Sequence, residues 1–268
     1  MRSAAKVVGV VAAVLAIGGC RNTLVYYPTR APEVELVLAA QERGLVPWMH
    51  EGRRIGWRPA SSPDSARRII VFHGNAGHSL HREYLRNGFQ LVREEWDVYL
   101  FEYPGFGSRP GRPGEETLVA AGFEAVDALM SEDPSRPVSL LGESLGSGVA
   151  AQVAAGRSSA VSGMLLITPF TSIVDAAAAR FPRFLVRAVL TDRYDSERAL
   201  EGYAGRVAVL VAGRDTVVPA DLGRRLYKGY GGPKRLWVQE QAGHNSLDYT
   251  PGAAWWAQVS AFLAGHSM

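Results

Sequence analysis

The chain has 268 residues, 47% of them hydrophobic, with glycine and proline at regular intervals. This length and composition suit one large α/β domain better than two small ones. The formal net charge is only +3, from 29 Lys and Arg against 26 Asp and Glu, which excludes the strongly basic balance of a nucleic-acid-binding protein. We therefore expect no nucleic-acid partner, and we expect a monomer.

The chain begins with the layout of a secretory signal. Arg2 and Lys6 give a basic start, an apolar run follows from Val7 to Gly19, and small residues precede Cys20. The run is too short to span a bilayer, which needs roughly 20 apolar residues. Residues 17–20 resemble a bacterial lipobox, in which the cysteine is lipidated and becomes the mature N-terminus. We expect residues 1–20 to be a lipoprotein signal peptide with Cys20 as the lipidation site; the alternative is an ordinary signal peptide.

The cysteine content fits an envelope location. Cys20 is the only cysteine, so the folded part must be stable outside the cytoplasm without a disulfide. Arg21 rather than Asp follows it, which by resemblance to the bacterial sorting rule favours the outer membrane where there is one. We expect a cell-envelope protein, lipid-anchored to a membrane and facing outside the cytoplasm, with residues 21–32 as an extended tether.

The next hundred residues read as a series of helices and strands. We expect a helix over Glu33–Arg43, outer strands over Val46–Met49 and Arg54–Trp57, a central buried strand over Arg68–Phe72, a helix over Arg82–Glu95, a strand over Val98–Phe101 and an amphipathic helix over Glu115–Ser131.

A glycine-containing loop, His73–Gly77, follows the central strand directly. Such a loop beside a nucleophile supplies a backbone N–H group to an oxyanion hole, and Asn75 is our candidate donor. We interpret His73 as a structural histidine that holds this loop by hydrogen bonds, in preference to a proton-transfer role. A second glycine-rich turn, Glu102–Ser108, brings its backbone close to the same place.

The pattern G-x-S-x-G stands between a strand and a helix. Val138–Leu141 is an apolar run of strand length, and Ser147–Ala155 is small and Ala-rich, as a helix packed closely on a sheet should be. A serine in so sharp a turn has strained backbone angles and close neighbours, which the flanking Gly142 and Gly146 accommodate. The pattern predicts a nucleophile elbow at Ser144; the alternative is a plain loop turn.

An elbow places its serine where an anion can be stabilised. The Ser144 hydroxyl stands at a helix N-terminus, where backbone N–H groups point at a developing negative charge. We expect the oxyanion hole to use the N–H groups of Leu145, the residue after the nucleophile, and of Asn75.

The stretch Phe170–Arg206 separates two strands, Met164–Ile167 and Val207–Val211, by more than a single crossover needs. Part of it should fold over the site as a small helical cap. Its apolar residues line an acyl pocket or simply pack the cap onto the body: Phe181, Phe184, Leu185, Val186 and Val189. Arg183 and Arg187 share one helical face, which we interpret as solvated in preference to a lipid-headgroup contact.

The base is selected by the order Ser, acid, His that elbow enzymes share. Only two histidines, His244 and His266, follow Ser144. His266 lies at the C-terminal end, beyond the expected final helix Gly252–Ala264. His244 follows the strand-like Arg235–Val238 in a loop that can swing an imidazole over the sheet. We therefore expect His244 to be the base.

The acid must lie between Ser144 and His244. Among the carboxylates there, Asp215 alone comes just after an apolar strand, Val207–Val211. We expect Asp215 to be the orienting acid, with Asp195 as the alternative. The alternation of strands and helices predicts an α/β fold with a mostly parallel sheet of about eight strands, helices on both faces and the site at the carboxyl ends of the strands.

The elbow, acid, histidine and loop, in this order, resemble the α/β-hydrolase superfamily. Three stretches more narrowly resemble its serine aminopeptidase-like branch, the "alpha/beta hydrolase domain-containing" proteins, some of which are acyl-protein thioesterases: Phe72–His78, Glu102–Gly107 and Asp192–Ser196. The resemblance covers about Tyr26–Leu263 and implies an α/β-hydrolase domain over residues 33–268, with residues 170–206 as the small cap. One departure is Ala212, where the family usually has glycine three residues before the acid.

These roles predict a serine hydrolase that cleaves carboxylic esters or thioesters through an acyl-enzyme. Asp215 would orient His244, which would take the proton of Ser144, and water would later release the acyl group. We expect a small-molecule or lipid ester as substrate. No cofactor or metal is expected, because no ligand cluster with metal spacing is visible. The alternatives are a serine peptidase of the same fold and a non-catalytic binding lipoprotein.

Overall fold

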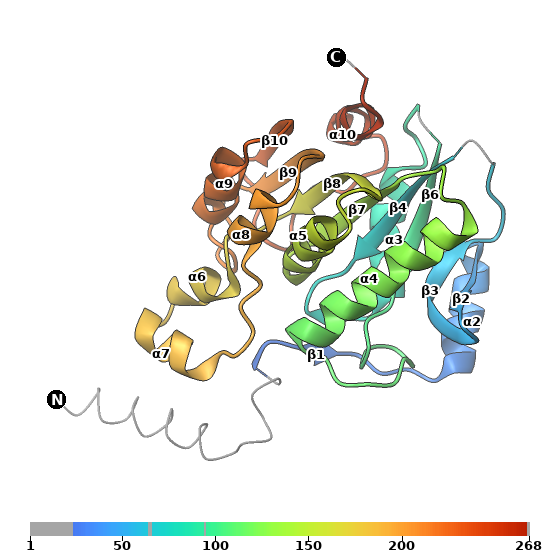
Figure 1. The fold of residues 1–268 in the computed structure, drawn as a ribbon, viewed down its shortest axis with the longest axis horizontal. Coiled ribbons are helices and arrows are strands. Elements are labelled where there is room, and N and C mark those ends of the chain that lie inside the picture. Colours follow the sequence, from blue (N-terminus) through green and yellow to red (C-terminus); the bar gives the residue numbers. More distant parts are fainter. Residues whose placement is uncertain (1–23, 64–65, 94, 267–268) are drawn as a thin grey trace.

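The computed structural model describes residues 24–63, 66–93 and 95–266. Within them one sheet has eight strands in the order β10-β9-β8-β7-β4-β6-β3-β2 (Figure 1). The strands are β2 (Leu45–His50), β3 (Arg53–Pro59), β4 (Arg67–Phe72), β6 (Trp96–Phe101), β7 (Val138–Glu143), β8 (Val161–Ile167), β9 (Arg206–Ala212) and β10 (Lys234–Gln239). The pairs from β10 to β6 are parallel, and β3 pairs antiparallel with both β6 and β2. The predicted, mostly parallel eight-stranded sheet is confirmed.

Two hydrophobic cores lie on opposite faces of this sheet. Along β4, Ile70 and Phe72 belong to one core, whereas Ile69 and Val71 belong to the other, because successive strand side chains point to opposite faces. Helices α4 (Glu115–Glu132), α5 (Leu145–Gly156), α8 (Ser196–Glu201) and α9 (Ala220–Gly229) share the first core. Helices α2 (Glu33–Glu42), α3 (Glu83–Gly88) and α10 (Ala254–Ala264) share the second. The expected helices on both faces are therefore present.

The helix expected over Arg82–Glu95 is wrong in length. A short 3-10 helix, η2 (Ser79–Arg82), leads into α3, which ends at Gly88. Gly88 packs so closely on Trp256 that a Cβ atom would lie 2.1 Å from the indole ring. The next residue, Phe89, is buried against the rings of Trp96 and Trp256. Packing against a distant helix thus ends α3 early, although helix-forming residues follow it.

The first described residues are tied to the loop after β4. Strand β1 (Tyr27–Pro28) pairs in parallel with β5 (Ala76–Gly77), and Tyr27 N–H donates to Asn75 O over 2.8 Å. The predicted leader, including Cys20, lies outside the described residues. In residues 24–63, 66–93 and 95–266, no helix is both long enough and apolar enough to cross a membrane.

The segment between β8 and β9 contains α6 (Ile173–Ala178), α7 (Arg183–Val189) and α8. Helix α8 packs against α5, and its Leu200 belongs to the same core as Val149 of α5. Helices α6 and α7 instead project beyond the sheet, near β1 (Figure 1). They pack against each other and, as described below, cover an apolar pocket.

Candidate active site

The turn between β7 and α5 holds Ser144 in a strained conformation. Its φ of 52° and ψ of −116° lie where non-glycine residues are rare. A Cβ atom on Gly142 would lie 2.4 Å from Gly146 O, and one on Gly146 would lie 2.0 Å from Phe72 O. Both neighbours must therefore be glycine, as the sequence pattern predicts. The strain is typical of a residue held in place for its chemistry.

Three side chains form a hydrogen-bonded series that ends at this serine. His244 Nε2 lies 3.0 Å from Ser144 Oγ, and His244 Nδ1 lies 2.6 Å from Asp215 Oδ2. With Nδ1–H donating to the carboxylate, Nε2 is left to accept the proton of the serine hydroxyl. The Asp215 side chain is only 1% exposed, and its other oxygen accepts the N–H groups of Val217 and Val218. The carboxylate is thus fixed on both oxygens.

The sheet topology explains why these residues meet. Ser144 follows β7, Asp215 follows β9 and His244 follows β10; parallel strands bring their carboxyl ends to one edge of the sheet. Asp195, the alternative acid, instead caps α8 by accepting the N–H group of Arg198. His266 lies beyond α10, where its backbone N–H donates to Ala261 O.

The expected oxyanion donors lie beside Ser144. Asn75 and Leu145 line the same pocket as Ser144. Leu145 is the first residue of α5, so its N–H group has no partner within the helix. Asn75 is held by its side chain, whose Nδ2 donates to Val25 O over 2.9 Å, and by its backbone carbonyl, which accepts from Tyr27. These two bonds fix the backbone at Asn75.

His73 is fully buried below this loop. Its Nδ1–H donates to Gly74 O over 2.8 Å, and its ring packs on Tyr103 with 4.3 Å between centroids. Burial acts to raise the pKa of Glu102, but the nearby His73 ring and the Ser79 hydroxyl and N–H groups hold that pKa below its usual range. The contacts of His73 fit a loop-holding residue.

Arg82 connects the loop to the elbow, and nothing in the sequence pattern indicated it. Its Nε donates to Glu143 Oε2 over 2.6 Å, and one terminal nitrogen donates to Ala76 O over 3.1 Å. Tyr84 donates its hydroxyl to the other oxygen of Glu143. Burial and the Glu143 carboxylate raise the pKa of Tyr84, which keeps it a donor. Glu143 immediately precedes Ser144, so Arg82 joins the two parts of the site.

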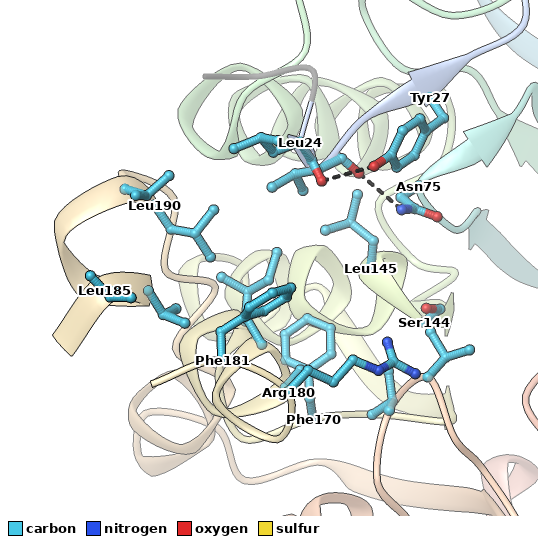
Figure 2. Close-up of a pocket in the computed structure, with 18 of the residues that line it drawn as sticks. Leu24, Tyr27, Asn75, Ser144, Leu145, Phe170, Arg180, Phe181, Leu185 and Leu190 are labelled. Atoms are coloured by element: carbon cyan, nitrogen blue, oxygen red, sulfur yellow. Dashed lines mark hydrogen bonds between the residues drawn. The ribbon is translucent and has the colours of Figure 1, made fainter. Parts of the chain in front are cut away.

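A pocket of about 850 Å³ opens beside Ser144. Figure 2 shows Leu24 and Tyr27 on one side and Phe181, Leu185 and Leu190 of the cap on the other, with Ser144, Leu145 and Asn75 at one end. Of the residues predicted to form an acyl pocket, four line it: Phe181, Leu185, Val186 and Val189. Phe184 does not line it and is 72% exposed. The wall formed by the N-terminal segment was not predicted.

The N-terminal wall of the pocket is anchored to the segment that follows the cap helices. The Tyr26 hydroxyl donates to the Asp192 carboxylate and lies 2.9 Å from the Tyr194 hydroxyl.

Arg180 is the one charged residue among those that line the described pocket. Among residues 24–63, 66–93 and 95–266, no group of three or more His, Cys, Asp or Glu side chains is placed to hold a metal ion.

Comparisons with known proteins agree with this architecture. An uncharacterized protein of Mycobacterium tuberculosis is 33% identical over 253 residues, covering 91% of this chain and 87% of that protein. The lysophosphatidylserine lipase ABHD12 of Danio rerio is 28% identical over 189 residues, 64% of this chain and 49% of that lipase. An esterase structure from Pyrococcus furiosus superposes with a TM-score of 0.67 at 16% identity, covering 90% of this chain and 98% of that one; this likeness shows the fold.

A family model places the chain more narrowly. The model described as serine aminopeptidase, S33, matches residues 63–196, which contain β4, the following loop and the turn at Ser144. Together with relatives that are named as lipase or esterase, the match supports a hydrolase. The chain therefore belongs to the serine aminopeptidase S33 family of the α/β-hydrolases.

Proposed function

We propose that this protein is a serine hydrolase that cleaves carboxylic esters or thioesters. Ser144 is the nucleophile, His244 the base and Asp215 the orienting acid. The observation that carries the proposal is the continuous series from Asp215 through His244 to Ser144 Oγ, with distances of 2.6 Å and 3.0 Å. A base oriented by a carboxylate and hydrogen-bonded to a strained serine is the arrangement that activates a hydroxyl for acyl transfer.

The reaction follows from these positions in two steps. His244 Nε2 takes the proton of Ser144, whose oxygen attacks the substrate carbonyl carbon. The N–H groups of Leu145 and Asn75 stabilise the resulting oxyanion, and His244 then protonates the leaving alcohol or thiol. Water, deprotonated by the same histidine, attacks the acyl-enzyme and releases the acid. The histidine returns the water's proton to Ser144 Oγ, so that these steps use only the chain's own residues, the substrate and water.

The pocket beside Ser144 favours an acyl chain over a peptide. The residues that line it are apolar except for four: Tyr27, Asn75, Ser144 and Arg180. No carboxylate is among the residues that line the described pocket, so nothing in it would pair with the α-ammonium group of an aminopeptidase substrate. An apolar acyl chain instead gains about 0.8 kcal/mol for each methylene that it buries. The relatives named as lipase and esterase agree with this choice.

The test compares p-nitrophenyl esters of increasing acyl length with aminoacyl amides. We expect kcat/KM to rise roughly fourfold for each added methylene until the pocket is filled, since 0.8 kcal/mol corresponds to that ratio. Ser144→Ala, the matched inactive variant, should lose at least roughly 10³-fold in kcat. Faster cleavage of aminoacyl amides than of every ester would overturn the ester assignment. Activity toward neither class would point to a binding module.

We further propose that the enzyme is a lipoprotein anchored in the cell envelope through Cys20. The support is in the sequence: a basic start, an apolar run and small residues before the only cysteine. Two or three acyl chains on such a residue hold a protein firmly on a membrane, whereas one chain binds only marginally. Mass spectrometry of the native N-terminus tests this directly. An unmodified Cys20, or cleavage elsewhere, would refute the anchor and leave the hydrolase proposal intact.

A further inference from the structure

Exposed apolar side chains gather around the mouth of the pocket. Large hydrophobic side chains that are more than two-fifths exposed include five in this region, which we call the apolar rim: Leu24, Tyr27, Phe181, Phe184 and Val217. Four of them line the pocket, and Phe184 adjoins Leu185, which does. They come from the N-terminal segment, the cap and the turn after β9, so the rim is assembled by folding. Such a concentration of exposed apolar surface marks an interaction site.

The part of the cap beside this rim, residues 173–190, has a net positive charge. Between Ile173 and Leu190 the chain has three exposed arginines and a single carboxylate. The arginines are Arg180, Arg183 and Arg187, and the carboxylate is Asp175. The Asp175 side chain is only 9% exposed and is paired with Arg183 and Arg225. The net charge presented outward is therefore positive. Arginine binds phosphate groups in a planar, two-pronged geometry, so this charge is complementary to anionic lipid headgroups.

The sequence before Leu24 limits how far the rim can lie from a membrane. The apolar run Val7–Gly19 and Cys20 precede it, and Cys20 is four positions away. Four extended residues span at most about 14 Å. A lipid on Cys20 would therefore hold Leu24, and with it the pocket mouth, close to the bilayer surface. An apolar rim at that distance can reach the boundary between headgroups and acyl chains.

We propose that the apolar rim and the cap arginines dock on the surface of an anionic lipid bilayer, so that the pocket opens toward the membrane. For Arg183 and Arg187 this docking replaces the solvated face that we inferred from the sequence alone. Leu24 lines the pocket, belongs to the apolar rim and lies four residues after the proposed anchor, Cys20. An anchor at this position would turn the rim toward the membrane. The partner is the lipid surface itself. This docking goes beyond the proposed hydrolysis, because it does not depend on Ser144 being reactive. It would let an apolar acyl chain enter the pocket without crossing water.

The test places an environment-sensitive fluorophore on the full chain through Phe184→Cys. Leu91→Cys is the matched control: Leu91 is 68% exposed and precedes the amino end of β6, at the sheet edge opposite the pocket. Labelling of the unsubstituted chain corrects for Cys20. Each protein is reconstituted in vesicles of phosphatidylcholine with phosphatidylglycerol, with and without spin-labelled lipid. We expect blue-shifted, lipid-quenched emission at position 184 only. Equal quenching at both positions, or none at 184, would overturn the proposal.

A second arm tests the charge. In the Phe184→Cys background, Arg187→Gln should lower the equilibrium constant for docking, the ratio of docked to undocked protein, roughly fivefold in anionic vesicles, since one cation near an anionic surface contributes about 1 kcal/mol. Arg67→Gln is the control, because Arg67 is exposed at the amino end of β4. An equal effect of both substitutions, or a blue shift at position 184 without any vesicles, would indicate that the occupant is not an anionic bilayer. Docking is measured by fluorescence and needs no turnover of substrate. The docking proposal and the hydrolase proposal can therefore be refuted independently of each other.

Discussion

The contact between Arg82 and Glu143 gives a sharp prediction. Arg82 is the residue that joins the loop carrying Asn75 to the turn carrying Ser144, through bonds of 2.6 Å to Glu143 and 3.1 Å to Ala76 O. The two side chains are only 15% and 13% exposed. Arg82→Ala therefore leaves a largely buried carboxylate with Tyr84 as its remaining donor, and leaves the Ala76 carbonyl without this donor.

The expected loss of stability in Arg82→Ala follows from the burial of the ion pair. Breaking a fully buried ion pair by removing one partner costs about 3–5 kcal/mol, and some access to water reduces the loss, so we expect Arg82→Ala to lower the free energy of unfolding by about 2–3 kcal/mol. Complete loss of an oxyanion donor costs about 10²–10³ in kcat; displacement of the Asn75 loop should cost part of this, roughly tenfold, with little change in KM. Arg82→Lys should recover stability but not kcat, since its ammonium cannot reach both partners in the same planar geometry.

Urea unfolding and steady-state kinetics on a water-soluble ester measure both effects. Arg43→Ala is the matched control: its Nε lies 2.7 Å from Glu83, but the two side chains are 34% and 30% exposed. We expect it to cost at most about 1 kcal/mol and to leave kcat unchanged. If Arg82→Ala behaved like Arg43→Ala in both measurements, the positioning role of Arg82 would be refuted.

Three further predictions concern other parts of the structure. Asp215→Asn should lower kcat roughly 10⁴-fold on a soluble ester. Asp195→Asn should leave kcat unchanged and cost at most about 1 kcal/mol, since asparagine can still accept the Arg198 N–H group and only the negative charge at the start of α8 is lost; the reverse order would move the acid to the cap. Gly146→Ala, whose Cβ would lie 2.0 Å from Phe72 O, should lower the free energy of unfolding by at least about 4 kcal/mol, and an unchanged Tm would contradict this packing. Burial lowers the pKa of His78 to about 4, so that as the pH falls the unfolded chain binds a proton at this histidine before the folded chain does; the free energy of unfolding should therefore fall by up to about 3 kcal/mol between pH 6.5 and 4. His78→Gln should flatten that part of the pH profile measured by urea unfolding. An unaltered profile would show that His78 does not cause the pH dependence.

The sequence predicts those parts of the site whose constraints are local. Short apolar runs mark the parallel strands because both faces of a parallel sheet are buried, as Ile69 to Phe72 are in β4. The turn at Ser144 is recognisable from a short sequence pattern, with one glycine two residues before the serine and one two residues after it. The contact that requires Gly142 is local, with Gly146 O, whereas the contact that requires Gly146 is with Phe72 O at the end of β4. Chain order and strand positions then select Asp215 and His244, since each follows an apolar run.

The remaining features depend on contacts between distant residues and leave no local signal. Helix α3 ends where Gly88 meets Trp256, a contact that no helical propensity reveals. Arg82 and Glu143 pair across 61 positions. The pocket wall at Leu24 and Tyr27 depends on β1 and β5, which have two residues each and are too short for a periodic pattern. Phe184 shows the same limit, because apolar character alone does not tell a pocket residue from an exposed one.

Covalent labelling of Ser144 tests the central claim most directly. The folded chain is treated with a fluorophosphonate probe, digested and analysed by mass spectrometry. An activated serine attacks the phosphorus atom, so we expect one probe per chain, on the peptide that contains Ser144, and no labelling of Ser144→Ala. His244→Ala should label far more slowly, because the hydroxyl then has no base. A folded wild-type chain that takes up no probe, or that takes it up at another serine and keeps it in Ser144→Ala, would contradict the proposed mechanism.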